Sequence, residues 1–333
     1  MRMRRKALFM CAAGTYLYEF GGKIMSTLER HEGKTVFLAD MAMLGAALFW
    51  GSGFAVTDRL LNSCSPLWLL TFRFVPSGML LSLVFWKRLR RISRRDFLRG
   101  SLLGVFLFTV FLAHIYGLVL STPGKQSFLA GANVVIVPFL YALFYRIWPS
   151  KWAFTAAGLT TAGILTMAFT PGMQFNLGDT FSLILAFGVA LHCIFVGNLT
   201  RKMDSCALTA LQISGAAVCF LGAALLLEPF PAFANGGRDL LWGIPYVALF
   251  VTVIPFLIQT VAQRYSPEVH AAILLSMESL FGYIIAIFMG QESLHLQIVF
   301  GGLLILGGVF TAELETYLAK RSASLDLLGK REG

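Results

Sequence analysis

The sequence predicts an all-α membrane protein with ten transmembrane helices, arranged as two inverted five-helix repeats. Three observations support this prediction: the composition, the length of the uncharged segments and the distribution of basic residues. Of the 333 residues, 57% are apolar and only 13% are charged, whereas a soluble domain carries about a quarter charged residues. So few charges could not cover a water-soluble surface of this size.

Long uncharged segments indicate the type of secondary structure. Gly100–Gly124, Trp152–Gly178 and Leu240–Gln263 contain no charged residue, and each exceeds the roughly 20 residues that a helix needs to cross a bilayer. Barrel strands would be about 10 residues long and would alternate in polarity. We therefore expect ten spanning helices, at residues 41–61, 67–86, 101–122, 126–147, 152–171, 179–199, 206–227, 241–262, 268–289 and 294–313.

The basic residues indicate the orientation in the membrane, because cytoplasmic loops are enriched in Lys and Arg. With ten helices and a cytoplasmic amino terminus, 23 of the 27 Lys and Arg residues fall in cytoplasmic segments, most densely over residues 87–99, and three fall outside. We expect a multi-pass protein of the cell (inner) membrane with both termini cytoplasmic. The net charge of +10 is then a topology signal, and no nucleic-acid partner is expected.

The segments outside the helices are a cytoplasmic amino-terminal segment, residues 1–38, and a cytoplasmic tail, residues 316–333. Basic residues followed by the apolar stretch Ala7–Tyr18 resemble the first two regions of a signal peptide. The stretch is short and no small-residue cleavage site follows it. A translation start at Met25 is the alternative that we favour, so we assign no function to this segment.

A weak internal repeat supports the two-unit architecture. We expect the first repeat at residues 39–171 and the second at residues 179–315. Each unit has five helices, an odd number, so the second unit must enter the membrane from the opposite side. Inverted repeats of this kind place the solute site near the bilayer midplane. Shifts of 139 and 144 residues align Asp40 with Asp179, Arg73 with Gln212, and Pro123 with Pro267.

Several classes of activity lack a sequence signal. The five cysteines show no paired spacing, which indicates neither a disulfide framework nor a metal site. The chain has no HExxH, GxSxG or GxxxxGK[ST] motif, and these motifs mark zinc proteases, serine hydrolases and phosphate-binding loops. We expect no cofactor and no enzymatic activity, and direct ATP drive is not indicated. An intramembrane enzyme acting on a lipid-linked substrate is the alternative function.

Four short motifs, taken in order, resemble the drug/metabolite transporter superfamily, EamA type. They are Ala47-Leu-Phe-Trp-Gly-Ser-Gly-Phe54, Arg73-Phe74, Leu208-Thr-Ala-Leu-Gln212 and Ser276-Met-Glu278. The resemblance covers nearly all of residues 39–315, with two departures: Ser279 follows Glu278 where the family often has proline, and Gln291 follows Gly290 where it has glutamate. The resemblance implies a secondary transporter that moves small organic metabolites or drugs across the membrane by alternating access, often outward.

Glu278 is the first candidate for the functional site. It lies about ten residues into the ninth predicted helix, near the midplane, where a carboxylate is costly and marks function by default. It could bind a substrate ammonium group or couple transport to protons. The alternative is a buried carboxyl group bonded to neighbouring helices.

Arg73 lies roughly seven residues into the second predicted helix. A guanidinium group can bind a substrate carboxylate with two parallel hydrogen bonds. Alternatively, the side chain extends to the membrane surface or pairs within an outer gate. Gln212, its counterpart in the repeat, would line the inner half of the path.

Further residues that could line a solute cavity come from four helices. Gly51 and Ser52 form a small-residue stretch beside Trp50, which serves either close helix packing or a cavity wall. Asn133 lies near the repeat counterpart of Glu278.

Two histidines lie within predicted spans. His114, with Tyr116, lies in the third helix, and His192 lies in the sixth. An intramembrane histidine can relay protons or simply pack.

Three residues are interpreted structurally. Lys125 opens the fourth predicted helix, and we expect it to be a solvated helix end. Pro138 and Pro255 interrupt helices four and eight, because proline lacks the backbone N–H and permits a kink. Such kinks could act as hinges. The expected partners are a small-molecule substrate and the lipid bilayer, with proton coupling and a homodimer as further hypotheses.

Overall fold

The computed structural model describes residues 35–168, 175–231, 237–297, 299–312, 314 and 318. All regular secondary structure in this part of the chain is helical, which confirms the all-α class. Most of the predicted amino-terminal segment and tail lie outside the described residues. The helices are Thr35–Leu61, α2 (Pro66–Val84), α3 (Trp86–Leu89), α4 (Arg94–Leu120), α5 (Pro123–Ala130), α6 (Asn133–Tyr145), α7 (Lys151–Ala168), α8 (Leu177–Thr200), α9 (Ser205–Leu227), α10 (Gly237–Ala248), the π-helix η2 (Leu249–Val253), α11 (Ile254–Ala262), α12 (Glu268–Leu275), α13 (Met277–Phe288) and Val299–Ala312.

Among the described residues, eight helices are long and apolar enough to cross a membrane. Three of them combine shorter elements: α5 with α6, α10 with η2 and α11, and α12 with α13. Two further helices, α7 and Val299–Ala312, lie at the positions predicted for the fifth and tenth spans. The number of ten spans therefore stays a prediction.

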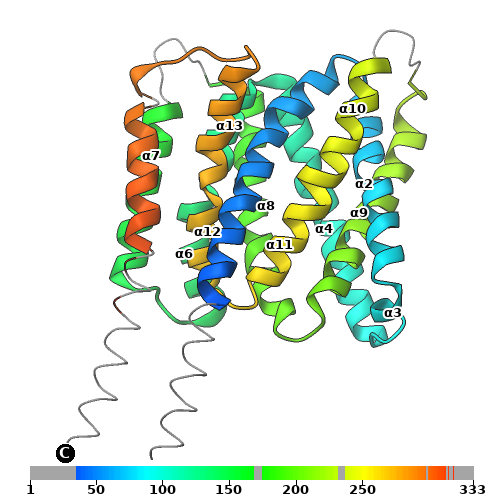
Figure 1. Cartoon of the computed structure of the whole chain (residues 1–333), viewed down its shortest axis with the longest axis horizontal. Helices are drawn as coiled ribbons and strands as arrows, with labels where there is room; N and C mark the ends of the chain where they lie inside the picture. Colours follow the sequence, from blue (N-terminus) through cyan, green and yellow to red (C-terminus); the bar gives the residue numbers. More distant parts are fainter. Residues whose placement is uncertain are drawn as a thin grey trace, which may run out of the picture.

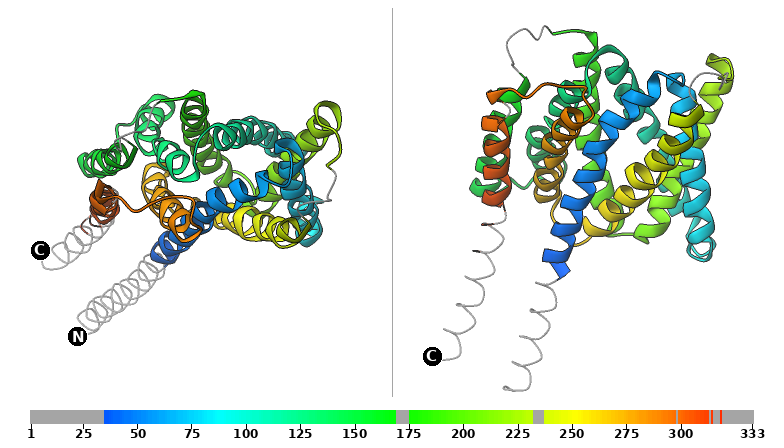
Figure 2. Two further views of the ribbon diagram at one scale, coloured as in Figure 1. Left: turned by 90° about the horizontal axis from the view of Figure 1, so that it is seen from above. Right: turned by 45° about the horizontal axis from the view of Figure 1, so that its top comes forward.

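The helices stand side by side in one bundle (Figure 1). The described chain begins and ends at the same end of this bundle, at the bottom of Figure 1, and α3 lies at that end too (Figures 1 and 2). We call it the basic end, because residues 87–99 between α3 and the first turns of α4 contain seven Lys and Arg residues. The far end of the bundle is called the opposite end.

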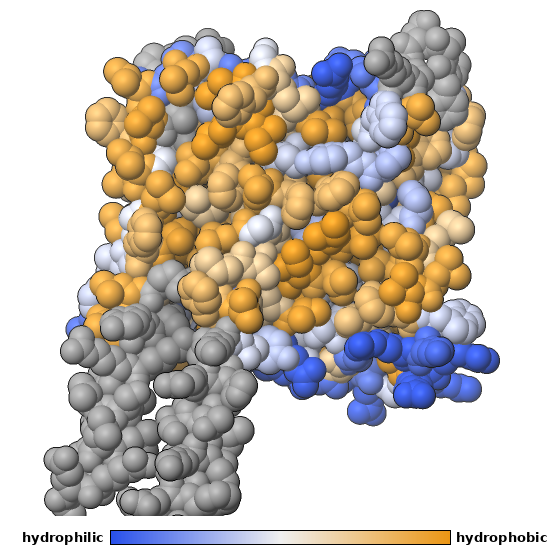
Figure 3. Space-filling model, in the orientation of Figure 1, coloured by the Kyte–Doolittle hydropathy of each residue, from blue (hydrophilic) through white to orange (hydrophobic). Residues whose placement is uncertain are grey.

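The outer surface of the bundle is apolar. On the face drawn in Figure 3, hydrophobic side chains cover the middle of the bundle, and hydrophilic side chains gather at the two ends, most densely at the basic end. Leu226 and Phe288 are each 85% exposed, which would be unfavourable in water but matches lipid tails. The surface thus has the form of a membrane-embedded bundle.

The backbone N–H groups at the start of α2 bond to a side chain from another helix end rather than to an N-cap residue. Ser65 makes no capping hydrogen bond. The Glu228 carboxylate, which follows α9, accepts instead from the backbone N–H groups of Leu67 and Trp68, and a negative charge is favourable at a helix N-terminus. Burial, and then the Glu228 charge, raise the pKa of the nearby Cys64 thiol to about 11.

Two spans are broken at corresponding positions. The span Pro123–Tyr145 breaks between α5 and α6, and the span Glu268–Phe288 breaks between α12 and α13. At both breaks backbone N–H groups bond to carbonyls three residues earlier, as in Ala132 to Leu129 and Ser279 to Ser276, which is the tighter 3₁₀ pattern. The second halves begin at Asn133 and Met277, 144 residues apart, the same shift that aligns Pro123 with Pro267.

The first half of one broken span, α5, contacts the second half of the other, α13. Ser279 Oγ donates to the Ser127 carbonyl at 2.8 Å, and Ser127 Oγ donates to the Ser279 carbonyl at 3.3 Å. The rings of Phe128 and Tyr283 stack with centroids 4.9 Å apart. The contact between α5 and α13 therefore joins the two halves of the chain directly.

The two prolines act differently from the expectation that both interrupt their helices. The α6 helix continues through Pro138, and its break lies at Gly131 and Ala132 instead. Pro255 does coincide with an irregularity, because it lies two residues after the π-helix η2. Proline has no N–H for the carbonyl four residues earlier, so the Val251 carbonyl cannot form the α-helical hydrogen bond to residue 255.

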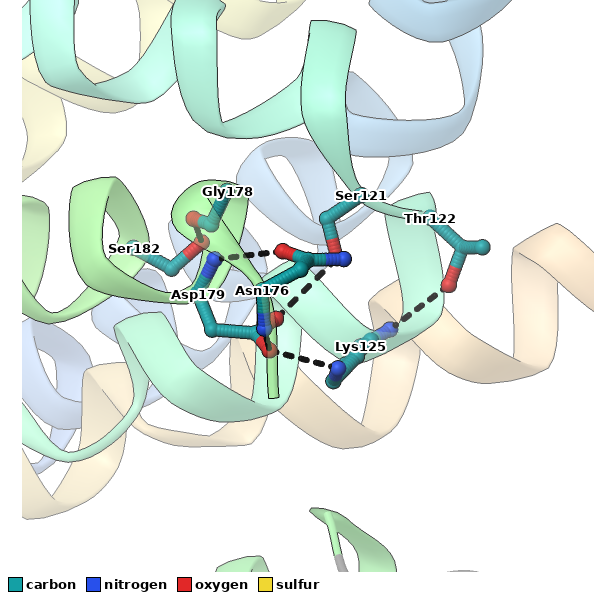
Figure 4. A network of polar contacts seen from close by, with 7 residues as sticks. All are labelled: Ser121, Thr122, Lys125, Asn176, Gly178, Asp179 and Ser182. Atoms are coloured by element: carbon teal, nitrogen blue, oxygen red, sulfur yellow. Dashed lines mark hydrogen bonds and ion pairs between the residues drawn. The ribbon is translucent and has the colours of Figure 1, made fainter. Parts of the chain in front are cut away.

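Lys125 is not a solvated helix end, contrary to expectation. Its side chain is only 10% exposed, and its Nζ lies 2.6 Å from Asp179 Oδ2, as Figure 4 shows. Asp179 is fully buried and forms a capping box with Asn176 at the start of α8. A buried carboxylate requires a partner, and the lysine supplies it.

Gly51 permits the closest approach of the Thr35–Leu61 helix to α13. A Cβ atom at this position would lie 2.7 Å from Gly282 N and 2.8 Å from the Glu278 carbonyl. Both neighbours are backbone atoms, so they cannot turn aside as a side chain would. The structure therefore supports the close-packing interpretation of this small-residue stretch.

We predict that Gly51→Ala destabilises the protein by about 1–3 kcal/mol, the usual cost of overpacking, and displaces the turn that bears Glu278. Gly45→Ala is the matched control on the same helix, because a Cβ atom there meets no atom within 4 Å. Thermal unfolding in detergent measures both variants. Equal melting temperatures for Gly51→Ala and the wild type would contradict the packing argument.

Candidate functional site

A cavity lies in the interior of the bundle, between the two halves of the chain. It contains about 800 Å³ of space between atoms, part of it open to solvent. Seven of the eight described spans contribute to its wall. The lining residues are Trp50, Gly53, Phe54, Arg73, Leu107, Val110, Phe111, His114, Ala130, Asn133, Val137, Leu185, Val189, His192, Cys193, Val251, Phe256, Gln259, Ala272, Leu275 and Glu278.

Arg73 is the positive group of this cavity. Its side chain is almost completely buried, at 2% exposure. Its Nε donates to Thr252 Oγ1 at 2.7 Å, and its Nη2 donates to the Val251 carbonyl at 3.1 Å, to which Pro255 has no N–H to donate. The guanidinium also lies 4.8 Å from the centre of the Phe111 ring, a favourable cation–π distance.

No carboxylate balances this charge within the described residues: the ion pairs found there involve other side chains. Taking a charge out of water without a counter-charge is costly. Neutral acceptors and an aromatic face offset part of that cost at Arg73. The guanidinium thus keeps capacity to bind an anionic group in the cavity.

Glu278 is the carboxyl group of the same cavity. It is the second residue of α13, directly after the break between α12 and α13, and it is 8% exposed. Its carboxylate takes part in neither an ion pair nor a hydrogen bond among the described residues. The alternative of a carboxyl group bonded to neighbouring helices is therefore not what the structure shows.

Aromatic rings form much of the remaining wall. Trp50 packs edge-on against Phe256 with ring centroids 5.2 Å apart, and the His114 ring packs edge-on against Phe54 at 5.2 Å. His114 therefore sits among aromatic side chains rather than in a chain of polar groups. Such walls favour a solute with an apolar body.

Two amides add unused hydrogen-bond acceptors to this wall. Asn133 is 3% exposed and Gln259 is 2% exposed. The side-chain oxygens Asn133 Oδ1 and Gln259 Oε1 have no hydrogen-bond partner among the described residues. Because a buried polar atom without a partner is unfavourable, each oxygen offers an acceptor to a bound solute or to water.

Three of the eight predicted site residues do not line the cavity. Ser52 Oγ bonds to the Phe49 carbonyl and to the Tyr246 hydroxyl. Tyr116 packs near Phe181, with ring centroids 6.1 Å apart. Gln212 is one layer behind the wall, so the structure brings together the other five: Trp50, Arg73, His114, Asn133 and Glu278.

Gln212 acts on the cavity through a neighbour. Its Oε1 lies 2.8 Å from His192 Nε2, and its Nε2 donates to Thr260 Oγ1 at 3.3 Å. His192 itself lines the cavity. Gln212 therefore orients a lining histidine rather than contacting the space directly.

Gln259 is a lining residue for which no role is predicted from the sequence, and His192, predicted only as a proton relay or a packing residue, also lines the cavity. Both are isolated polar residues within long apolar segments of the sequence. That signal is real but weak, since His114 and Gln212 share it and only one of those two lines the cavity. The rotation of each helix about its axis decides whether such a residue faces the cavity. A uniformly apolar segment gives no pattern from which that rotation could be predicted.

Comparisons with known proteins agree with this architecture. The model of the EamA-like transporter family matches the chain twice, at residues 37–169 and 176–313. The chain belongs to the EamA-like transporter family. The two matches divide this EamA-like transporter into successive units of the same kind, with the cavity between them.

Curated relatives and a solved structure support the assignment. The EamA-like transporter is 26% identical over 287 residues to an uncharacterized transporter of Archaeoglobus fulgidus, a match that covers 85% of this chain and 88% of the relative. A second uncharacterized transporter of that organism is 26% identical over 227 residues, covering 67% and 79%. A protein crystal structure at 16% identity has the same fold, with a TM-score of 0.69 over 85% of this chain and 98% of that chain.

Proposed function

We propose that this EamA-like transporter moves small zwitterionic organic solutes across the cell membrane by alternating access, in the outward direction. The observation that carries the proposal is the pair Arg73 and Glu278. This base and this acid line one cavity, and neither side chain forms an ion pair among the described residues. A solute with a carboxylate and an ammonium group would supply both missing charges.

The broken spans support alternating access. Interrupted helices beside a midplane site are a recurring feature of transporters built from inverted repeats. In this chain Asn133 is the first residue of α6 and Glu278 is the second residue of α13, the second halves of the two broken spans. Both residues line the cavity. Rocking of one unit against the other about the contact between α5 and α13 would open the cavity to each side of the membrane in turn.

The basic end corresponds to the cytoplasm in this proposal, by the excess of Lys and Arg over residues 87–99. Glu278 would also provide proton coupling. With no solute bound, protonation neutralises the isolated carboxyl group, and an arriving ammonium group displaces that proton. Proton and solute would then move in opposite directions.

A ligand series tests the proposal. Purified protein in detergent is heated with α-amino acids of graded size, with their amides, which lack the negative charge, and with their deaminated acids, which lack the positive charge. We expect the zwitterions to raise the melting temperature most and to show flux in proteoliposomes. Equal responses to all three members of a series would contradict recognition of both charges.

A further inference from the structure

A second buried ion pair resembles the Lys125–Asp179 pair at the opposite end. At the basic end, His270 Nε2 lies 3.5 Å from Asp40 Oδ1, with side-chain exposures of 11% and 1%. Both bases lie in the first turn of the first half of a broken span: Lys125 in α5, which begins at Pro123, and His270 in α12, whose N-cap is Pro267.

Each pair joins a carboxylate of one unit to a base of the other unit. Asp40 and Asp179 lie in the first helices of the first and second units, and their bases lie in the broken span of the other unit. The 139-residue shift that relates the two carboxylates was already apparent in the sequence. The carboxylates are therefore repeat counterparts, and the bases are one residue apart in the repeat, because the 144-residue shift aligns Lys125 with Val269, the residue before His270. One pair lies at each end of the bundle.

The two pairs differ in strength. At the opposite end, Asp179 also accepts from Asn176 N at 2.7 Å and from Ser121 Oγ at 3.3 Å (Figure 4). The Lys125–Asp179 contact is also shorter, at 2.6 Å against 3.5 Å for His270 and Asp40. The pair at the opposite end is therefore the stronger one.

We propose that these two pairs are latches of the transport cycle, each closing its own end of the cavity and separating when that end opens. This proposal rests on the alternating-access function proposed above. Because the Lys125–Asp179 latch is the stronger one, the empty protein favours closure at the opposite end. The solute would then enter from the basic end, which agrees with outward transport.

Thiol labelling tests the latches without requiring a solute. The native cysteines of the full-length protein are replaced by alanine, and Val189→Cys places one reporter in the cavity wall. A membrane-impermeant thiol reagent is applied to vesicles of each orientation. We expect Asp179→Asn to raise labelling from the opposite end at least fivefold and to lower labelling from the basic end, and Asp40→Asn to do the reverse.

Matched variants separate a latch from a general loss of stability. Lys125→Met should reproduce Asp179→Asn, and Lys125→Arg should resemble the parent protein. Asp239→Asn is the control at the same end, because its 3.3 Å pair with Arg59 is exposed, with side-chain exposures of 46% and 59%. It should leave labelling unchanged.

The outcomes distinguish this proposal from the proposed function. Unchanged labelling in Asp179→Asn, or an equal rise from both ends in both variants, would overturn the latches even if the wild type transports zwitterions. The expected opposite shifts in a protein that moves no zwitterion would support the latches and overturn the solute assignment instead.

Discussion

Glu278→Gln is expected to weaken the binding of a zwitterionic solute about 10- to 150-fold. A hydrogen bond to a charged group contributes about 1.5–3 kcal/mol, and about 1.4 kcal/mol corresponds to a factor of ten in affinity. Glutamine keeps the size of the side chain but cannot carry the negative charge. Because no other residue in the described part of the chain pairs with Glu278, the change leaves no partner stranded, and thermal stability without solute should be maintained.

Titration of solute binding and proteoliposome flux measure this loss. Glu292→Gln is the matched control: Glu292 accepts a hydrogen bond from Gly124 N but does not line the cavity. The deaminated acid, which has no ammonium group, should bind the wild type and Glu278→Gln with equal affinity. A Glu278→Gln protein that binds zwitterions as the wild type does would refute the role of this carboxylate.

Arg73→Lys is expected to lower affinity for the same solutes by a comparable 10- to 150-fold, although the positive charge is kept. Lysine is a point charge and cannot form the two parallel bonds of a guanidinium to a carboxylate. It would also fail to reach Val251 and Thr252 with the same geometry. We therefore expect a lower melting temperature as well, so affinity and stability must be measured separately.

A double-mutant-type cycle isolates the contact between Arg73 and the solute carboxylate. It compares the affinities of the wild type and Arg73→Lys for the zwitterion and for its amide. The amide of the solute, which has no negative charge, should lose affinity for the wild type but bind Arg73→Lys with little further loss. Thr252→Val removes one anchor of the guanidinium and keeps the guanidinium itself, so it should reduce stability more than affinity. If the amide and the zwitterion lose equally on Arg73→Lys, then Arg73 is a structural residue rather than a ligand contact.

Much of the fold follows from the sequence because the bilayer imposes a simple rule. A segment that crosses lipid must be helical and apolar, so uncharged stretches such as Gly100–Gly124 reveal a span without any knowledge of packing. Charged and polar residues inside spans then stand out as site candidates. Arg73 and Glu278 were found in this way, and both line the cavity.

What the sequence leaves open is the rotation of each helix and the local breaks. Gln212 and Gln259 are equally isolated polar residues, yet only Gln259 faces the cavity, because neighbouring helices set the rotation. The break near Gly131 carries no strong signal, while Pro138, which carries one, lies within a continuous helix. Lys125 is buried because Asp179, 54 residues further on, reaches it, and such a pairing depends on tertiary structure.

The neutral surroundings of Arg73 have a consequence for the passage of inorganic cations through the empty protein. Its guanidinium is held by a hydroxyl, a backbone carbonyl and an aromatic ring rather than by an acid. A fixed positive centre inside a membrane pathway repels inorganic cations, and the Glu278 carboxyl group of the same cavity does not offset it while protonated, as proposed for the empty protein. Until a solute's carboxylate arrives, the vacant carrier should therefore oppose leakage of sodium and potassium and so preserve the ion gradients of the cell.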